Sequence, residues 1–318
     1  MGDIQFIISS SPHIRSEESI PKIMYSVIIA LIPAIAASIF IFGVKALWLI
    51  VTCTVVSILT EYIFQKIRKK DVTTIDGSAA LAGILLALTL PPGFPYTAAA
   101  LGSIVAIALG KHIFGGLGYN IFNPALIGRA FLQAAFPVLI TTWERPLAWL
   151  SEEVDAVTAA TPLSMMKFDM KIESLSKMLI GNVGGSLGET SAIALLLGAA
   201  FLLYKGYIQW RIPAGIFTSV VIFGGIFWII DPSKYPDPLF HILAGGMLIG
   251  AFFMATDMVT SPITYKGYWI FGIGIGILTI IIRLKGGLPE GVMYSILLMN
   301  AITPLINRYT RPRILGRK

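Results

Sequence analysis

The sequence predicts an all-α polytopic membrane protein, with about ten transmembrane helices arranged as two five-helix inverted repeats that contain broken helices. Two observations predict this fold class: 56% of the 318 residues are hydrophobic, giving a mean hydropathy of +0.80, and only 13% are charged. A soluble domain carries about 25% charged residues, and a disordered chain combines low hydrophobicity with high net charge. Both of those classes are therefore excluded.

Ten apolar stretches are candidate membrane spans, since crossing the hydrocarbon core takes about 20 apolar residues. In chain order they are 23–43, 46–65, 77–90, 96–110, 124–140, 191–204, 212–230, 239–255, 268–283 and 289–307. Two short spans end in helix-breaking sequence: 77–90 stops before Pro91, and 239–255 stops before Thr256-Asp257, with Ser261-Pro262 following. Each is predicted to be a half-helix, because proline ends a helix and restricts the residue before it.

A repeated Gly-Gly-Leu sequence, at 115–117 and 286–288, supports pairing the two halves of the chain. With five spans in each half, the second half enters the membrane from the opposite side. Paired broken helices in an inverted repeat indicate a binding or conduction site near the midplane. The alternative is that proline and glycine are simply common in membrane helices.

The distribution of positive residues predicts which loops lie on the cytoplasmic side of the membrane. Most of the 24 Lys and Arg residues fall on one side of the predicted spans, above all in the run KIRKK at 66–70, and cytoplasmic loops carry such an excess. The net charge of +7 therefore does not indicate a nucleic-acid partner. Five segments are predicted: a cytoplasmic segment 1–22, a first repeat 23–140, an extracytoplasmic loop 141–190, a second repeat 191–307 and a basic cytoplasmic tail 308–318.

The single cysteine, Cys53, excludes several kinds of metal centre in this chain. One thiolate cannot hold an iron–sulfur cluster, and no CxxC or HExxH spacing is present for haem or zinc. We therefore expect no metal site of these kinds, and any electron carrier on this chain is expected to be organic.

The predicted loop contains the sequence DAVTAATPL at 155–163. By itself, this pattern is typical of a helix start, with Thr161 as the capping residue and Pro162 at the first helical position.

The same motif resembles the flavinylation site of membrane subunits in the Rnf and sodium-pumping NADH:quinone reductase complexes. The resemblance implies that a flavin transferase joins FMN, through its phosphate, to the hydroxyl of Thr161. It also implies that Asp155 and Thr158 belong to the part of the motif that the transferase recognises.

Three further segments resemble the RnfD family of membrane subunits: DGSAALAGILLALTLPP at 76–92, KHIFGGLGYNIFNPALIGRAF at 111–131 and ATDMVTSP at 255–262. The resemblance implies a multi-pass subunit of a prokaryotic inner or plasma membrane, embedded in lipid and with both termini cytoplasmic. It implies partner subunits that carry ferredoxin-linked, NAD-linked and FMN chemistry, and electron transfer coupled to Na+ or H+ movement. By analogy with the related pump, a non-covalent riboflavin is a second expected cofactor.

Three charged residues near the spans have both a functional and a structural interpretation. In the functional interpretation, Arg129 binds a flavin group or fixes an ion gate. In the structural interpretation, it binds backbone carbonyls or extends to the membrane interface. Asp257 lies on a cation path, or it caps the next turn. For Glu61, near Lys66 and Arg68, an interfacial salt bridge is the simplest expectation.

Two other functions fit the sequence less well than a redox subunit. An inverted repeat with broken helices also suits a stand-alone channel or transporter for a small solute. A scaffold for partner subunits is the third possibility. Covalent flavin distinguishes the redox subunit from both.

Overall fold

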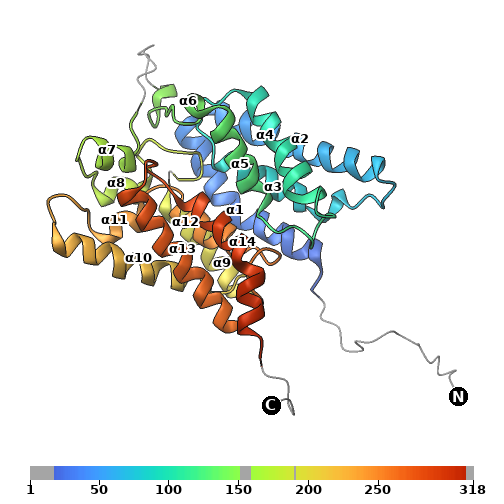
Figure 1. Ribbon diagram of the computed structural model, residues 1–318. Helices are drawn as coiled ribbons and strands as arrows, with labels where there is room; N and C mark the ends of the chain where they lie inside the picture. Colours follow the sequence, from blue (N-terminus) through green and yellow to red (C-terminus); the bar gives the residue numbers. More distant parts are fainter. Residues whose placement is uncertain (1–17, 151–158, 190, 313–318) are drawn as a thin grey trace, which may run out of the picture.

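The computed structural model describes residues 18–150, 159–189 and 191–312, and every regular element in these ranges is helical (Figure 1). Fourteen α-helices, α1 to α14, alternate with short 3₁₀ and π segments, and these ranges contain no strand. The all-α prediction is confirmed for this part of the chain. Residues 1–17 of the predicted N-terminal segment and 313–318 of the predicted tail lie outside the described residues.

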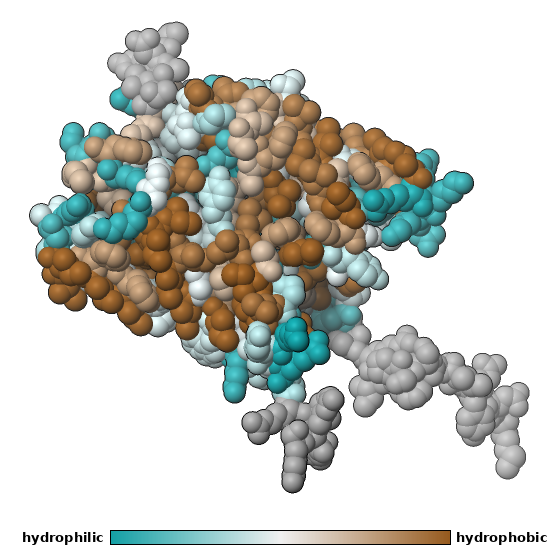
Figure 2. Space-filling model, viewed as in Figure 1, coloured by the Kyte–Doolittle hydropathy of each residue, from teal (hydrophilic) through white to brown (hydrophobic). Residues whose placement is uncertain are grey.

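Four of the described helices are long and apolar enough to cross a membrane: α1 (Ile20–Phe42), α2 (Val44–Ile67), α10 (Arg211–Ile230) and α13 (Tyr265–Lys285). Their outward faces carry large exposed apolar side chains, for example Ile222 at 53% exposure. Figure 2 shows this apolar surface over α10 and α13, whereas polar side chains gather at the far end of α2. Extended apolar surface of this kind is typical of contact with lipid. The chain is therefore a multi-pass membrane protein.

The first group of helices begins with α1 and α2. It also contains α3 (Ser78–Leu88), α4 (Tyr96–Ile107) with a π segment (Ala108–His112), α5 (Pro124–Ala135) and α6 (Pro137–Ile140). Here α2 packs against α3 and α4, and α4 packs against α5. The start of α3 follows from its sequence, because Gly77 takes a φ of +79° and the Asp76 carboxylate accepts a hydrogen bond from Ser78 N at 2.8 Å.

The second group of helices is built around α10 and α13. Its other members are α9 (Ala192–Lys205), α11 (Pro238–Leu243), α12 (Met247–Ile249) with a π segment (Gly250–Met254) and α14 (Val292–Thr310). Here α10 packs against α11 and α13, and α13 packs against α14. The two groups meet along α1 and α9 and also where α5 approaches α14.

Helix is present at each of the ten predicted spans, but two spans are broken where we expected continuity. The prediction of one helix over 124–140 is wrong, because the chain leaves the helical conformation at Phe136. The cause is Pro137, which disfavours the helical region for the residue before it. The predicted half-helix 239–255 has an additional break after Leu243, where Gly245 takes a φ of +63°.

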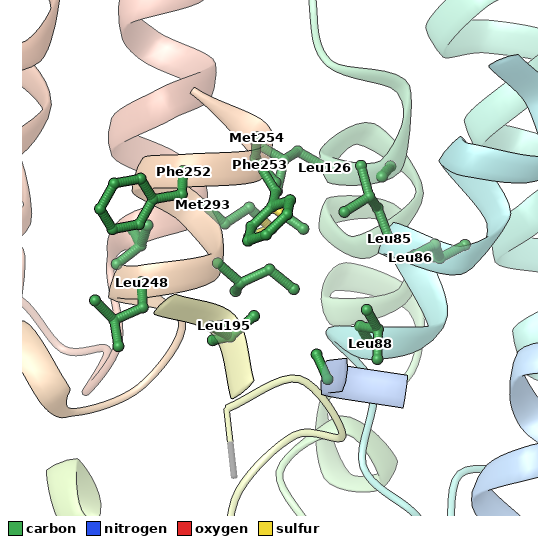
Figure 3. Packing of buried hydrophobic residues seen from close by; sticks show 14 of the residues in the cluster. Leu85, Leu86, Leu88, Leu126, Leu195, Leu248, Phe252, Phe253, Met254 and Met293 are labelled. Atoms are coloured by element: carbon green, nitrogen blue, oxygen red, sulfur yellow. The ribbon is translucent and has the colours of Figure 1, made fainter. Parts of the chain in front are cut away.

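The short broken helices meet at the centre of the molecule. Figure 3 shows Leu85, Leu86 and Leu88 of α3 on one side of a buried cluster and Leu248 of α12 and Phe252 of the π segment that follows it on the other, with Phe253 between them. All six side chains are buried and belong to one hydrophobic cluster that joins both groups of helices. Burial of these apolar side chains holds the broken helices in place where hydrogen bonding along the backbone is interrupted.

The loop between the groups has regular structure of its own. Its described parts contain a 3₁₀ turn (Ala148–Leu150), α7 (Pro162–Phe168) and α8 (Leu175–Ile180). Leu163 and Met166 of α7 and Met178 of α8 form a small cluster with Phe240 and Ala244 at α11. The loop is therefore docked on the second group of helices.

Close contact between α1 and α9 generates the first prediction. A Cβ on Gly198 would lie 2.0 Å from the carbonyl oxygen of Ala30, so Gly198→Ala forces the two helices apart. We expect a loss of about 1–3 kcal/mol in the free energy of unfolding, measured as a lower thermal midpoint in detergent. Gly225→Ala in α10 is the matched control, because its Cβ would make only an ordinary contact with Pro238 at 3.7 Å. Equal midpoints for the two variants would contradict the prediction.

Candidate functional site

A cavity of about 330 Å³ lies where the loop meets both groups of helices, and we call it the Thr161 cavity. Its lining includes Thr161 of the loop, Arg129 of α5, Glu189 at the end of the loop and Glu290 just before α14. Three aromatic side chains, Trp143, Phe168 and Tyr294, also line it. The cavity therefore combines apolar ring surfaces with a small number of charged groups, as ligand sites commonly do.

Thr161 caps α7 and also lines this cavity. Its Oγ1 accepts a hydrogen bond from Ser164 N at 3.2 Å and donates one to Ser164 Oγ at 2.9 Å. The capping interpretation is therefore confirmed, and Pro162 occupies the first turn as expected. Capping does not compete with modification, since an esterified Oγ1 keeps a lone pair for the Ser164 N–H and loses only its donated bond. Asp155 and Thr158 lie outside the described residues.

Arg129 is buried, with 4% of its surface exposed. The sequence places it locally, because Asn123 caps α5 by accepting from Ala125 N at 3.0 Å and Pro124 opens the helix. Its guanidinium donates to the carbonyl oxygen of Thr89 and to Oε2 of Glu290. The expectation of a backbone-carbonyl partner is confirmed. The expectation that Arg129 reaches the membrane interface is wrong, since the ion pair holds it inside the protein.

The partner of Arg129 was not predicted from the sequence. Glu290 comes 161 residues later, in the turn that leads to α14, and Gly291 there takes a φ of +85°. The Arg129–Glu290 ion pair therefore joins the first group of helices to the second. Arg129 Nε is buried and has no hydrogen-bond partner among the described residues.

A second carboxylate, Glu189, lies beside this pair. A Cβ on Gly246 would lie 2.7 Å from Glu290 Oε1 and 3.3 Å from Glu189 Oε1, so the two oxygens are neighbours around one glycine. Burial of the Glu189 carboxyl raises its pKa to about 7; the charge of Glu290 adds to this rise, and Arg129 opposes it. Glu189 lies in the glycine-rich stretch GNVGGSLGET at 181–190, whose composition is typical of a flexible connection, so the sequence alone did not single out Glu189 as a site residue.

Arg283 of α13 is fully buried and contacts the same region at the turn that contains Glu290. It donates to the carbonyl oxygens of Glu290 at 3.0 Å, His241 at 2.5 Å and Ala244 at 2.9 Å. The bonds to His241 and Ala244 satisfy carbonyls that the break after α11 leaves without helical partners. A charged residue in an apolar span was the available signal, and it is typical of a buried functional or structural site.

Lys167 attaches α7 to the second group of helices. Its ammonium donates to the carbonyl oxygens of Arg283 at 3.1 Å, Gly286 at 2.5 Å and Leu288 at 2.9 Å. Partial burial lowers the pKa of Lys167 from its ordinary value. Three hydrogen bonds from one charged group fix the helix that begins at Thr161.

Asp257 lines a separate cavity of about 90 Å³, together with Asn123 and Lys111. Its carboxylate accepts from Thr260 Oγ1 at 3.0 Å and from Val259 N at 3.4 Å, which is the turn-capping arrangement. In the described ranges, no group of three or more His, Cys, Asp or Glu side chains could hold a metal ion. A cation path at Asp257 stays a prediction.

Glu61 does not form the expected interfacial salt bridge with Lys66 or Arg68. It is buried and pairs with Lys111 at 2.5 Å, while Lys111 also donates to Ser78 Oγ at 2.6 Å. Arg68 instead donates to the carbonyl oxygen of His112. The π segment that ends α4 turns Lys111 inward, and sequence spacing alone did not predict this.

The Lys167 contacts give the second prediction. Lys167→Met removes the hydrogen bonds that hold α7 on the second group of helices. The backbone amides of α7 are therefore expected to exchange with solvent at least about tenfold faster, a change that the loss of roughly one hydrogen bond to a charged group would already produce. Hydrogen–deuterium exchange of the backbone amides of residues 163–168 measures this change. Lys171→Met is the matched control because the Lys171 side chain is exposed. Unchanged exchange in Lys167→Met would show that these contacts do not hold α7.

Nearly the whole chain is similar to known proteins. Residues 7–316 match the model of the NQR2, RnfD, RnfE family. The D subunit of the proton-translocating ferredoxin:NAD(+) oxidoreductase complex of Clostridium ljungdahlii is 51% identical, over 96% of this chain and 95% of the relative. The D subunit of the Na(+)-translocating complex of Acetobacterium woodii is 46% identical, over 99% and 97%. The D subunit of an ion-translocating oxidoreductase complex from Stutzerimonas stutzeri is 39% identical, over 94% and 93%. The chain therefore belongs to the NQR2, RnfD, RnfE family.

Proposed function

We propose that the chain is the RnfD-type membrane subunit of a complex that couples electron transfer between ferredoxin and NAD to ion translocation. The observation that carries this proposal is the full-length similarity to subunits with that name, at 51% and 46% identity. The chain works as part of an enzyme, since the relatives are subunits of oxidoreductase complexes. Its single cysteine cannot supply the ligands of an iron–sulfur cluster. Ferredoxin and NAD chemistry therefore belongs to partner subunits.

The proposed cofactor of this chain is FMN, joined through its phosphate to Oγ1 of Thr161. Three features of the cavity fit that group: its size, its aromatic lining and the positive charge of Arg129 in that lining. Flavin, when bound, supplies one- and two-electron chemistry that no side chain offers. Arg129 is the residue that would bind its polar atoms, and Lys167 holds the attachment helix in position. Asp155 and Thr158 would serve transferase recognition.

The proposed architecture is ten spans in two inverted repeats, 23–140 and 191–307. Corresponding contacts support it: α2 packs against α4 as α10 packs against α13. Each repeat also has a buried cation shortly before its Gly-Gly-Leu sequence, Lys111 in the first and Arg283 in the second. The orientation with cytoplasmic termini and an extracytoplasmic Thr161 loop rests on the distribution of positive residues.

The translocated ion is proposed to be Na+ or H+. Its proposed path includes Asp257 and the cavity beside it. The names of the relatives support either ion, because the Clostridium relative is called proton-translocating and the Acetobacterium relative Na(+)-translocating. A non-covalent riboflavin stays a prediction.

A denaturing gel under ultraviolet light tests the flavin proposal. The chain, co-expressed with a flavin transferase, is expected to give a fluorescent band, because a phosphoester bond survives denaturation. Thr161→Ala should abolish the band, whereas Thr158→Ala should keep it at reduced or equal intensity. A band that persists in Thr161→Ala, or no band in the unmodified chain, would contradict attachment at Thr161.

A further inference from the structure

The carboxylates of Glu189 and Glu290 form a pair that the proposed electron-transfer role does not explain. They come from different parts of the chain, the end of the loop and the turn before α14, yet both face Gly246 and both line the Thr161 cavity. Two carboxylates with oxygens around the same glycine repel each other when both are ionised, so such a pair tends to hold one proton.

The charged and titratable groups around the pair decide which carboxylate is charged. Arg129 of α5 is hydrogen-bonded to Glu290, and Arg283 of α13 is committed to three backbone carbonyls, one of them that of Glu290. From α14, Tyr294 lines the same cavity. Glu290 thus has the guanidinium partner, whereas Glu189 accepts a long bond of 3.4 Å from the backbone N–H of Ser186. Glu189 is the better position for the proton.

A small chamber is lined by both carboxylates and by Arg129. Its volume is about 10 Å³, and its lining includes Arg129, Glu189, Glu290 and Thr89. That is close to the space one water molecule needs, and the lining offers more than the two polar partners that a buried water requires. Arg129 is buried and its Nε lacks a partner among the described residues, which indicates an acceptor at this position. A water there would link Arg129 to the carboxylates.

We propose that Glu189 and Glu290 form a proton-binding site in the wall of the Thr161 cavity, with the proton held on Glu189 and exchanged with cavity water. The site is a property of this chain and does not depend on a bound flavin. The pKa of Glu189, raised by its burial, places loss of the proton near neutral pH. Where a cofactor in the cavity gains or loses a proton, this pair is positioned to supply or accept it.

Infrared titration of the full-length chain in lipid nanodiscs tests the proposal. The Thr161→Ala background is used, so that failure of flavin attachment and failure of the proton site are distinguishable. A band of a protonated carboxyl group is expected on the acidic side of about pH 7 and should be lost on the alkaline side. Glu189→Gln should remove this band. Glu173→Gln is the control, since Glu173 pairs with Lys177 outside the cavity, and it should keep the band.

A second variant keeps the test decisive if Glu189→Gln perturbs folding. Glu290→Gln removes the neighbouring negative charge and frees Arg129, so the band of Glu189 should titrate at lower pH than in the parent chain. The proposal is overturned if the titrating band is absent from the parent chain, persists in Glu189→Gln, or keeps its midpoint in Glu290→Gln.

Discussion

The ion pair between Arg129 and Glu290 is the contact on which the Thr161 cavity depends. It links α5 of the first group of helices to the turn before α14 in the second. Each partner makes a further hydrogen bond: Arg129 donates to the carbonyl oxygen of Thr89, and the backbone carbonyl of Glu290 accepts from Arg283. The Arg129 side chain is 5% exposed and that of Glu290 is 25% exposed, so removing Glu290 leaves a buried guanidinium without its counter-charge, which is costly. The pair therefore fixes how the two groups approach each other.

The remaining parts of the site follow from that junction. The loop closes the cavity from one side, because α7 and α8 pack on α11 and Lys167 binds the carbonyls that follow α13. Thr161 thus lines a cavity whose other lining residues include charged side chains from both groups of helices. A threonine on an untethered loop would sample many positions, whereas here a cofactor attached to its hydroxyl would be restricted to one region.

The sequence was sufficient for features that depend on local rules. Pro162 after Thr161 predicted a capped helix, and a cation in an apolar span marked Arg129 as buried and important. Features that depend on distant residues could not be predicted. Glu290 is 161 residues from Arg129, and Glu61 pairs with Lys111 instead of its sequence neighbours. Local pattern carries no information on such distances, and the glycine-rich sequence around Glu189 gave no sign that its carboxylate lies beside that of Glu290.

A double-mutant cycle on Arg129 and Glu290 tests whether their ion pair holds the two groups of helices together. The free energy of unfolding in mixed micelles is measured for the parent chain, Arg129→Met, Glu290→Gln and the double variant. If the pair joins the two groups of helices, the double variant should lose less stability than the sum of the single variants, with a coupling energy above about 1.5 kcal/mol. Additivity within about 0.5 kcal/mol would show that the two side chains act independently and would contradict a structural role for the pair.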